Sequence, residues 1–506
     1  MTTYRRKATL AALSAAVVAG ALLPTAPASA AAASAAAPRL DWTPCGPAGQ
    51  GQECATLPVP LDYRDPRGEQ LALAVTRIRS TRPDARRGTL LALPGGPGGS
   101  GVERLTQKGP RLARETGGMY DLVGFDPRGV GGSTRAHCRI DEADRRLVTL
   151  RAWPGPDGGI DVNVERSRRV ADACRRNGGP VLDSLTTANQ VRDMDLLRRA
   201  LGERRISVWG SSYGAYAAAQ YAQKHPHRTD RIVLDSSGDP DPRRVAQGWL
   251  RDMAKGVDDR FPDFAAWAAH PDRDGEGLRL AERPEQVRPL FLAPAARLDV
   301  TPVPSAHPGV PVDGNVLRQA LQVSLVGDAA FPALARLIQA VQDPAAATDP
   351  ARRPVLPPPL AAPLSDEDAT ITTGVVCNDV RWTGTVEEHR AAVAADRAAH
   401  PLTAGLPANI TPCAYWKEPA EKPTRITAKG PSNILMIQNR RDPNTPHSSG
   451  LKMRAALGDR ARLVTVEQGG HGVYLGNGNA CGDATVSRFL RTGERPAEDT
   501  YCPSAD

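Results

Sequence analysis

The sequence predicts an α/β protein in which a mostly parallel sheet is flanked by helices and interrupted by a helical insertion. Three observations support this fold class. Short runs rich in leucine and β-branched residues recur near both ends of the 506-residue chain, with segments of helical periodicity between them. The runs are apolar throughout, which indicates strands covered by helices on both faces of the sheet. Between residues 240 and 425 apolar residues recur every four positions, which indicates helices.

We divide the mature chain into three parts on this evidence. Residues 31–239 form the first part of the sheet domain, and its strands are expected at residues 71–78, 88–93, 120–126, 206–209 and 231–235. Residues 240–425 form a helical lid insertion. Residues 426–506 complete the sheet domain, with strands expected at residues 434–438 and 463–467.

Two segments between the strands have clear local signals. A helix is expected to begin at Thr187, which can cap it, and to end at Gly202. Inside the lid, residues 344–363 are rich in proline and alanine, and we expect them to form an exposed connector.

The composition is typical of a folded globular chain, with 41% hydrophobic and 24% charged residues. It excludes disordered, collagen-like and coiled-coil proteins. The formal net charge of +8 is spread over the whole chain, so we expect no nucleic-acid partner. No segment after the N-terminal region is apolar enough to cross a bilayer, so we expect no stable membrane insertion.

Residues 1–30 have the three parts of a signal peptide. A basic start at Arg5, Arg6 and Lys7 is followed by an apolar run over residues 8–23 and by a small-residue cleavage site at residues 28–30. A membrane-spanning helix is the alternative, but the run is short and ends at Pro24. We therefore expect a secreted, extracellular protein.

All eight cysteines follow this segment, and an even number in an exported chain indicates disulfides. A zinc site would require paired cysteines or a histidine-rich spacing, and the sequence has neither. If sequence neighbours pair, four local bridges result: Cys45 with Cys54, Cys138 with Cys174, Cys377 with Cys413, and Cys481 with Cys502.

The pentapeptide Gly210–Gly214 matches GxSxG, with Ser212 as the candidate nucleophile. The match alone is weak, but its context supports it. It follows the expected strand at residues 206–209 and opens an alanine-rich helix, which is the arrangement that a nucleophile elbow requires. The helix N-terminus then favours negative charge that develops beside Ser212.

A serine nucleophile needs a base, and the base needs an orienting acid. His471 lies between two glycines shortly after an expected strand, and Asp442 follows the strand at residues 434–438. We predict that Ser212, His471 and Asp442 form a catalytic triad. His447 is the rival base and Asp126 the rival acid, although Asp126 precedes the nucleophile in the chain.

The glycine-rich segment after the strand at residues 88–93 is the expected oxyanion loop, because backbone N–H groups there can point at an oxyanion. We expect the donors in the region of Gly95 and Gly96 and at the N–H of Tyr213. A dinucleotide site is the alternative, since Gly96, Gly98 and Gly101 also fit GxGxxG and Asp121 follows 20 residues later.

Together these motifs resemble the prolyl-iminopeptidase branch of the α/β-hydrolases, and more narrowly the secreted actinobacterial tripeptidyl aminopeptidases. The resemblance rests on residues 95–98, 126–129, 210–214, 442–446 and 470–472, in that order. It implies an exopeptidase that releases short peptides from free N-termini beneath a helical lid. Pro94 departs from the pattern, because iminopeptidases usually have histidine there. Arg128 is expected to anchor its own turn through carboxylate or carbonyl contacts.

A peptidase that requires a free N-terminus needs a carboxylate about 10 Å from Ser212, the span of three extended residues. Asp379 is the first candidate, and Asp366, Glu367 and Asp368 are the second. The chemistry needs no metal or organic cofactor. An esterase, lipase or lactone hydrolase with the same triad is the alternative enzyme, and a non-catalytic surface binding protein is the alternative of another class. The oligomeric state is left open.

Overall fold

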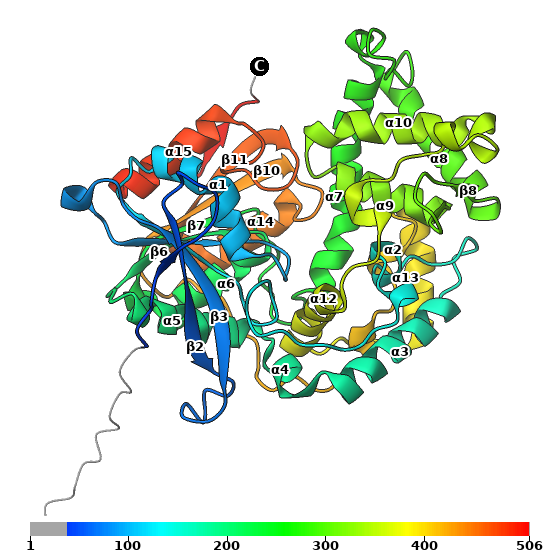
Figure 1. Cartoon of the computed structure of the whole chain (residues 1–506). Helices are drawn as coiled ribbons and strands as arrows, with labels where there is room; N and C mark the ends of the chain where they lie inside the picture. The colour runs from blue at the N-terminus through cyan, green and yellow to red at the C-terminus, as the bar shows by residue number, and fades with distance from the viewer. Residues whose placement is uncertain (1–37, 505–506) are drawn as a thin grey trace, which may run out of the picture. The chain divides into compact units, whose positions relative to one another are not determined.

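The computed structural model describes residues 38–504, so the predicted signal peptide lies outside the described residues. The described chain contains a ten-stranded sheet (Figure 1). Its strands, in spatial order, are β1 (Thr43–Pro44), β2 (Gln52–Pro60), β3 (Gln70–Ile78), β5 (Asp121–Phe125), β4 (Thr89–Leu93), β6 (Ile206–Ser211), β7 (Thr229–Asp235), β10 (Ile434–Arg441), β11 (Ala461–Gly469) and β12 (Thr500–Cys502).

The sheet is parallel from β5 to β12, and its first strands are antiparallel. All seven predicted strands form, which confirms the mostly parallel α/β prediction. The prediction missed β1, β2 and β12. In β2 the residues Pro58 and Pro60 hid the strand pattern, because proline is depleted in strands and confined to positions without a ladder N–H.

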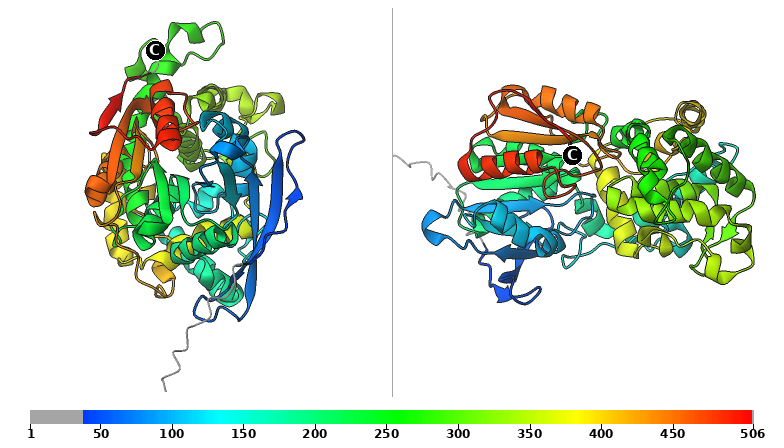
Figure 2. Two further views of the ribbon diagram at one scale, coloured as in Figure 1. Left: turned by 90° about the vertical axis from the view of Figure 1, so that its left-hand side faces the viewer. Right: turned by 90° about the horizontal axis from the view of Figure 1, so that it is seen from above.

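Helices cover both faces of the sheet (Figures 1 and 2). Alternate residues of β4 separate the two cores: Leu90 packs with α1 and α15, and Leu91 packs with α5, α6 and α14. These helices are α1 (Gly101–Glu115), α15 (Ala480–Thr492), α5 (Thr187–Ala200), α6 (Tyr213–Lys224) and α14 (His447–Leu457). The hydroxyl of Thr186, one residue earlier than predicted, accepts the capping hydrogen bond at the start of α5.

The helical lid contains one segment that the sequence did not predict. Residues 240–425 do form helices, but part of the excursion between β5 and α5 packs with them. Ile160, which directly precedes α3, and Val164 of α3 join a buried cluster with Val393 and Ile410. The lid helices are α2 (Leu147–Leu150), α3 (Asp161–Asn177), α4 (Gly179–Ser184), α7 (Gln247–Ala269), α8 (Pro284–Val300), α9 (Gly314–Ser324), α10 (Phe331–Gln342), α11 (Pro358–Ala361), α12 (Asp366–Asp379) and α13 (Val386–Ala399).

The proline- and alanine-rich stretch is largely exposed, as predicted, but it is not an irregular connector. It forms two 3₁₀ helices and α11, and Leu356 and Leu360 are buried in the lid core. Proline is favoured in the first turn of a helix, which explains short helices in a proline-rich segment. Leu356 and Leu360 anchor the stretch, whereas Val355, which directly precedes Leu356, stays exposed.

The cysteines pair as predicted, in four disulfides: Cys45–Cys54, Cys138–Cys174, Cys377–Cys413 and Cys481–Cys502. The third bridge fastens α12 to the short 3₁₀ helix Pro412–Tyr415 in the lid, and the fourth fastens α15 to β12. Across residues 38–504, no helix is both long and apolar enough to span a membrane.

Candidate active site

Ser212 lies on a sharp turn between β6 and α6. Its backbone has φ 58°, which is a strained conformation for a residue with a side chain. A Cβ at Gly210 would lie 2.2 Å from the carbonyl oxygen of Gly214, and one at Gly214 would lie 2.5 Å from that of Pro94. Both glycines are therefore required for β6, α6 and the loop after β4 to approach so closely.

The glycine-rich loop after β4 lies against Ser212. A Cβ at Gly95 would be 2.9 Å from Ser212 Cβ and 3.3 Å from its Oγ, so only glycine fits there. Gly96 has φ 122° and precedes a cis peptide bond to Pro97. Tyr213 is the first residue of α6, and its N–H has no acceptor within that helix. The predicted oxyanion donors thus surround the predicted nucleophile.

Asp442 and His471 form a buried pair. His471 Nδ1 lies 2.9 Å from both carboxylate oxygens of Asp442, which is completely buried. The same carboxylate accepts hydrogen bonds from the N–H groups of Asn444 and Thr445, each at 2.9 Å, and from Thr445 Oγ1 at 3.0 Å. Burial disfavours the imidazolium, but the charge and hydrogen bond of Asp442 outweigh it, so the pKa of His471 is raised.

The loop that carries His471 and the turn that carries Ser212 are both attached to the end of β7. Ser212 N–H donates to the carbonyl of Asp235 at 2.8 Å. The Asp235 carboxylate accepts from the N–H groups of Val473 at 2.8 Å and Tyr474 at 3.1 Å, and Ser236 Oγ accepts from Gly472 N–H at 3.0 Å. Residues far apart in the chain are thereby fixed to one strand end.

The ring of His471 hydrogen-bonds through Nδ1, to Asp442 and Thr445. Within the described part of the chain, no hydrogen bond joins its Nε2 to Ser212 Oγ. The structure therefore brings the predicted acid and base together and attaches the nucleophile beside them. The proton transfer from Ser212 to His471 stays a prediction.

Asp235 is the residue that the sequence reasoning missed. Its position at the end of an apolar strand beside the nucleophile turn was the available signal, because strand ends carry the site residues in open α/β sheets. Trp209 Nε1 and Ser236 Oγ also donate to its carboxylate. Burial nevertheless dominates, and it raises the pKa of Asp235.

The rival residues have other roles. His447 Nε2 lies 3.0 Å from Thr465 Oγ1 on β11. The carboxylate of Asp126 accepts hydrogen bonds from Ser100 Oγ, at the start of α1, and from the N–H of Gly132. Asp126 thus holds the glycine-rich loop to the following turn.

The dinucleotide alternative fails on strand geometry. Asp121 begins β5, whereas the glycine-rich loop follows the end of the neighbouring parallel strand β4. The carboxylate and the loop therefore lie at opposite ends of these parallel strands. Asp121 accepts hydrogen bonds from Ser80 N–H and from Arg86 instead.

A cavity of about 350 Å³ opens beside Ser212. The sheet domain contributes Gly96, Pro97 and Tyr213 to its wall, the acid loop contributes Asn444 and Thr445, and both lid segments supply the rest. Most of the lid residues are apolar, and no aspartate or glutamate lines the cavity. Among residues 38–504, no group of three or more histidine, cysteine or acidic side chains is placed to hold a metal ion.

None of the four candidate amine-binding carboxylates lines this cavity. Asp379 accepts hydrogen bonds from the N–H of Thr187 at 2.8 Å and from its Oγ1 at 2.5 Å, and it lines a separate pocket. Glu367 lies near Arg135 and His137. The position of Asp379 has a local cause, because its carboxylate accepts a hydrogen bond from an N–H group in the first turn of α5.

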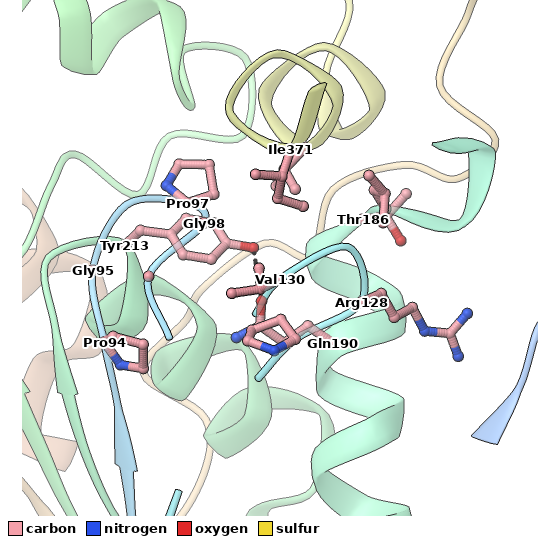
Figure 3. Close-up of a pocket in the computed structure, with 14 residues that line it drawn as sticks. Pro94, Gly95, Pro97, Gly98, Arg128, Val130, Thr186, Gln190, Tyr213 and Ile371 are labelled. Atoms are coloured by element: carbon pink, nitrogen blue, oxygen red, sulfur yellow. Dashed lines mark hydrogen bonds between the residues drawn. The ribbon is translucent and has the colours of Figure 1, made fainter. Parts of the chain in front are cut away.

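A smaller pocket lies behind the oxyanion loop (Figure 3). The hydroxyl of Tyr213 donates to Gln190 at 3.1 Å and lies 2.7 Å from Thr187 Oγ1. Arg128 points away from this pocket and binds Asp193 through two hydrogen bonds, of 2.7 and 2.8 Å. It also donates to the carbonyls of Pro60 and Leu61, which confirms its predicted anchoring role.

Two family models match the chain. The α/β-hydrolase fold matches residues 88–286, and a model described as TAP-like protein matches residues 402–502. The chain is 30% identical to a tripeptidyl aminopeptidase of Streptomyces lividans, over 92% of this chain and 86% of that protein.

More distant relatives have different names. Serine protease Hip1 of Mycobacterium tuberculosis is 27% identical, over 92% of this chain and 91% of its own, and carboxylesterase B of the same species is 29% identical, over 89% and 86%. Among solved structures, a proline iminopeptidase of Mycobacterium smegmatis aligns with a TM-score of 0.34 at 16% identity, over 86% of this chain and 97% of its own.

Proposed function

Because the chain belongs to the tripeptidyl aminopeptidase family of α/β-hydrolases, we propose that it is a secreted serine exopeptidase that releases tripeptides from free N-termini. Its substrates are then peptides. The observation that carries this proposal is the convergence of Ser212, the glycine-rich loop and the buried Asp442–His471 pair at neighbouring strand ends. These are the groups that acyl transfer to water requires.

In the proposed mechanism, Ser212 Oγ attacks the carbonyl carbon of the third peptide bond while His471 accepts its proton at Nε2. The N–H groups near Gly95 and Gly96 and that of Tyr213 bind the oxyanion. His471 then protonates the leaving amine, and an acyl-enzyme remains. Water, deprotonated by His471, hydrolyses this ester and frees the tripeptide and Ser212.

The environment of His471 supports its role as base. Asp442 binds Nδ1, which leaves Nε2 as the nitrogen for proton transfer. The acid also stabilises the imidazolium that forms, and the raised pKa of His471 has this cause. Since Asp442 already accepts three further hydrogen bonds from Asn444 and Thr445 of its own loop, it orients the ring without moving.

The lid supports action on short chain ends. The cavity of about 350 Å³ is closed on several sides by lid residues, which suits a few peptide residues rather than a folded protein surface. The four disulfides support export to an oxidising compartment, because such bridges rarely persist in a reducing cytosol.

An esterase is the second candidate function, and one observation favours it. An apolar cavity without a carboxylate offers no ionic anchor for a free α-ammonium group. One of the similar chains is also named carboxylesterase B.

A substrate panel separates the two functions. We expect the purified protein to cleave Ala-Ala-Ala-p-nitroanilide faster than Ala-p-nitroanilide, the N-acetylated tripeptide or p-nitrophenyl butyrate. Ser212→Ala should lower kcat/KM at least about 10⁴-fold. Ser211→Ala is the matched control on the same turn and should retain activity within about tenfold. Turnover of the ester alone would favour the esterase, and turnover that persists in Ser212→Ala would exclude both.

A further inference from the structure

The cavity beside Ser212 is lined by three hydrogen-bond donors that have no partner among the described residues. Arg151 follows α2, and within residues 38–504 its guanidinium makes no hydrogen bond or ion pair. Trp382 is only 7% exposed, yet its Nε1 has no acceptor. The buried Oγ1 of Thr411 also lacks a partner.

Arg151 differs in this respect from three buried arginines that bind carboxylates. Arg128 binds Asp193, Arg318 binds Asp299 and Arg198 binds Asp195. Polar groups that are buried without partners cost free energy, and native structures contain few of them. Two such buried donors, at Trp382 and Thr411, and the unpaired guanidinium of Arg151 on the same cavity wall indicate that the wall is built for a ligand rather than for the fold.

The segments that carry these donors are fastened together. Asn409 Nδ2 donates to the carbonyl of Ala152 at 2.7 Å, which holds the segment before Thr411 beside the residue that follows Arg151. The disulfide Cys377–Cys413 fastens the segment after Thr411 to α12, five residues before Trp382. The donors are therefore held in place before any ligand binds.

The chemistry of the three donors selects the ligand. A guanidinium and an indole N–H can only donate, and a hydroxyl can do so as well. No acidic side chain lines the cavity, so the acceptor has to come from the substrate. A guanidinium matches the planar oxygens of a carboxylate better than any other peptide group. We propose that Arg151, with Trp382 and Thr411, binds a carboxylate of the substrate.

This inference rests on the proposed function, since it concerns the substrate of the same Ser212. Burial lowers the pKa of Arg151, and the described residues supply no neighbouring charge that opposes this effect. A bound carboxylate supplies a negative charge and thereby stabilises the protonated guanidinium. The carboxylate can come from an acidic side chain in the released tripeptide or from the C-terminus of a short substrate.

Paired substrates test the inference and separate these sources. In the first arm, kcat/KM is measured for tripeptide p-nitroanilides with glutamate or glutamine at each position in turn and alanine elsewhere. In the second arm, tetra-alanine is compared with tetra-alanine amide by chromatography of the products. We expect the free carboxylate to be preferred by about 10- to 100-fold in one arm, the range of a charged hydrogen bond.

Variants assign the preference to the subsite, with the ratio of acid to amide as the readout. Arg151→Met should reduce the ratio to about one, and Trp382→Phe, which keeps an aromatic ring but removes the indole N–H together with part of the ring system, should reduce it about fivefold. Arg176→Met is the matched control, because Arg176 is exposed on the same excursion and its loss changes the net charge equally. The ratio should stay unchanged in that variant.

The outcomes distinguish this inference from the proposed function. If neutral tripeptides are cleaved but no carboxylate is preferred, or if the preference survives Arg151→Met, the subsite is wrong and the peptidase stands. If no peptide is cleaved, the proposed function fails. Calorimetric binding to the Ser212→Ala protein of the acid and amide members of whichever pair shows the preference gives the same comparison without turnover. Equal affinities would also overturn the subsite.

Discussion

The two sides of the cavity differ in how their polar groups are satisfied. On the catalytic side, Asp442 accepts hydrogen bonds from the backbone, from Thr445 and from His471, and Asp235 fastens the loop after His471. On the lid side, Arg151 and Trp382 have donors without partners in the described chain. The first arrangement is complete in the absence of substrate, and the second is completed by a ligand.

The comparison indicates where each kind of substitution acts. Groups that are already bonded hold the geometry of the reaction, so their loss should lower the rate for every substrate. Groups without partners affect only the substrates that can bind them. Each prediction below changes one side and measures whether the other responds.

The largest effect is expected at Asp442. Asp442→Asn keeps the size of the side chain but removes the charge that orients His471 and stabilises its imidazolium, so kcat should fall about 10⁴-fold. The loss should be the same for acidic and neutral tripeptides, because both use the same proton transfer. Steady-state kinetics with both substrates measures this. Asp126→Asn is the control carboxylate, and a comparable loss of kcat there would shift the role of acid towards Asp126.

The catalytic side could be predicted from the sequence because its signals are local. Gly210 and Gly214 belong to one short motif, and Asp442 and His471 each follow a strand whose apolar run is easy to recognise. The order of these motifs along the chain supplied the rest. Asp235 also ends such a strand, but it carries no motif, so its hydrogen bonds to Val473 and Tyr474 were not foreseen.

The lid side could not be predicted in the same way. Its wall combines the segment near Arg151 with residues more than 200 positions later in the chain, and nothing local indicates that they meet. The prediction placed Asp379 in the cavity because it follows Cys377. In the structure the hydroxyl and N–H of Thr187 bind its carboxylate instead. Proximity in the sequence thus predicted the disulfide, but it did not predict where the side chain of Asp379 points.

The next effect concerns the bridge that fastens the lid side. Replacing Cys377 and Cys413 by serine opens a loop with a sequence separation of 36 residues, and loop entropy predicts a loss of about 4 kcal/mol in the free energy of unfolding. The preference for carboxylate substrates should fall more than kcat for neutral ones, because the segments of Trp382 and Thr411 lose their tether. Urea unfolding and the paired substrates measure both.

Cys481–Cys502 provides the matched control for that bridge. It joins α15 to β12, far along the chain from the lid, with a sequence separation of 21 residues. Serine at both positions should also lower the stability, but the ratio between acidic and neutral substrates should remain that of the native protein. Equal changes of the ratio in both double variants would mean that the lid side is not organised by its own disulfide.

The smallest effect is expected at Asp379, which lines a separate pocket and binds the first turn of α5. Burial raises its pKa to about 6, although Thr187 donates two hydrogen bonds to it. Between pH 4 and 6 the folded chain therefore holds a proton that the unfolded chain has released. The free energy of unfolding should fall as the pH rises through this window, by about 3 kcal/mol in total from this group.

Asp379→Asn should remove this dependence, so the variant should gain stability relative to the native protein between pH 4 and pH 7. Urea unfolding at each pH measures the difference. Glu421→Gln is the informative control. The hydrogen bond of Arg192 lowers the pKa of Glu421, so the contribution of Glu421 to stability changes with pH in the opposite direction. That variant should lose relative stability as the pH rises from 3 to 5. If the stability difference between Asp379→Asn and the native protein does not change with pH, the carboxylate is ionised at no cost. The hydrogen-bond network of Thr187 with Asp379 and Tyr213 would then offset the burial of Asp379 completely.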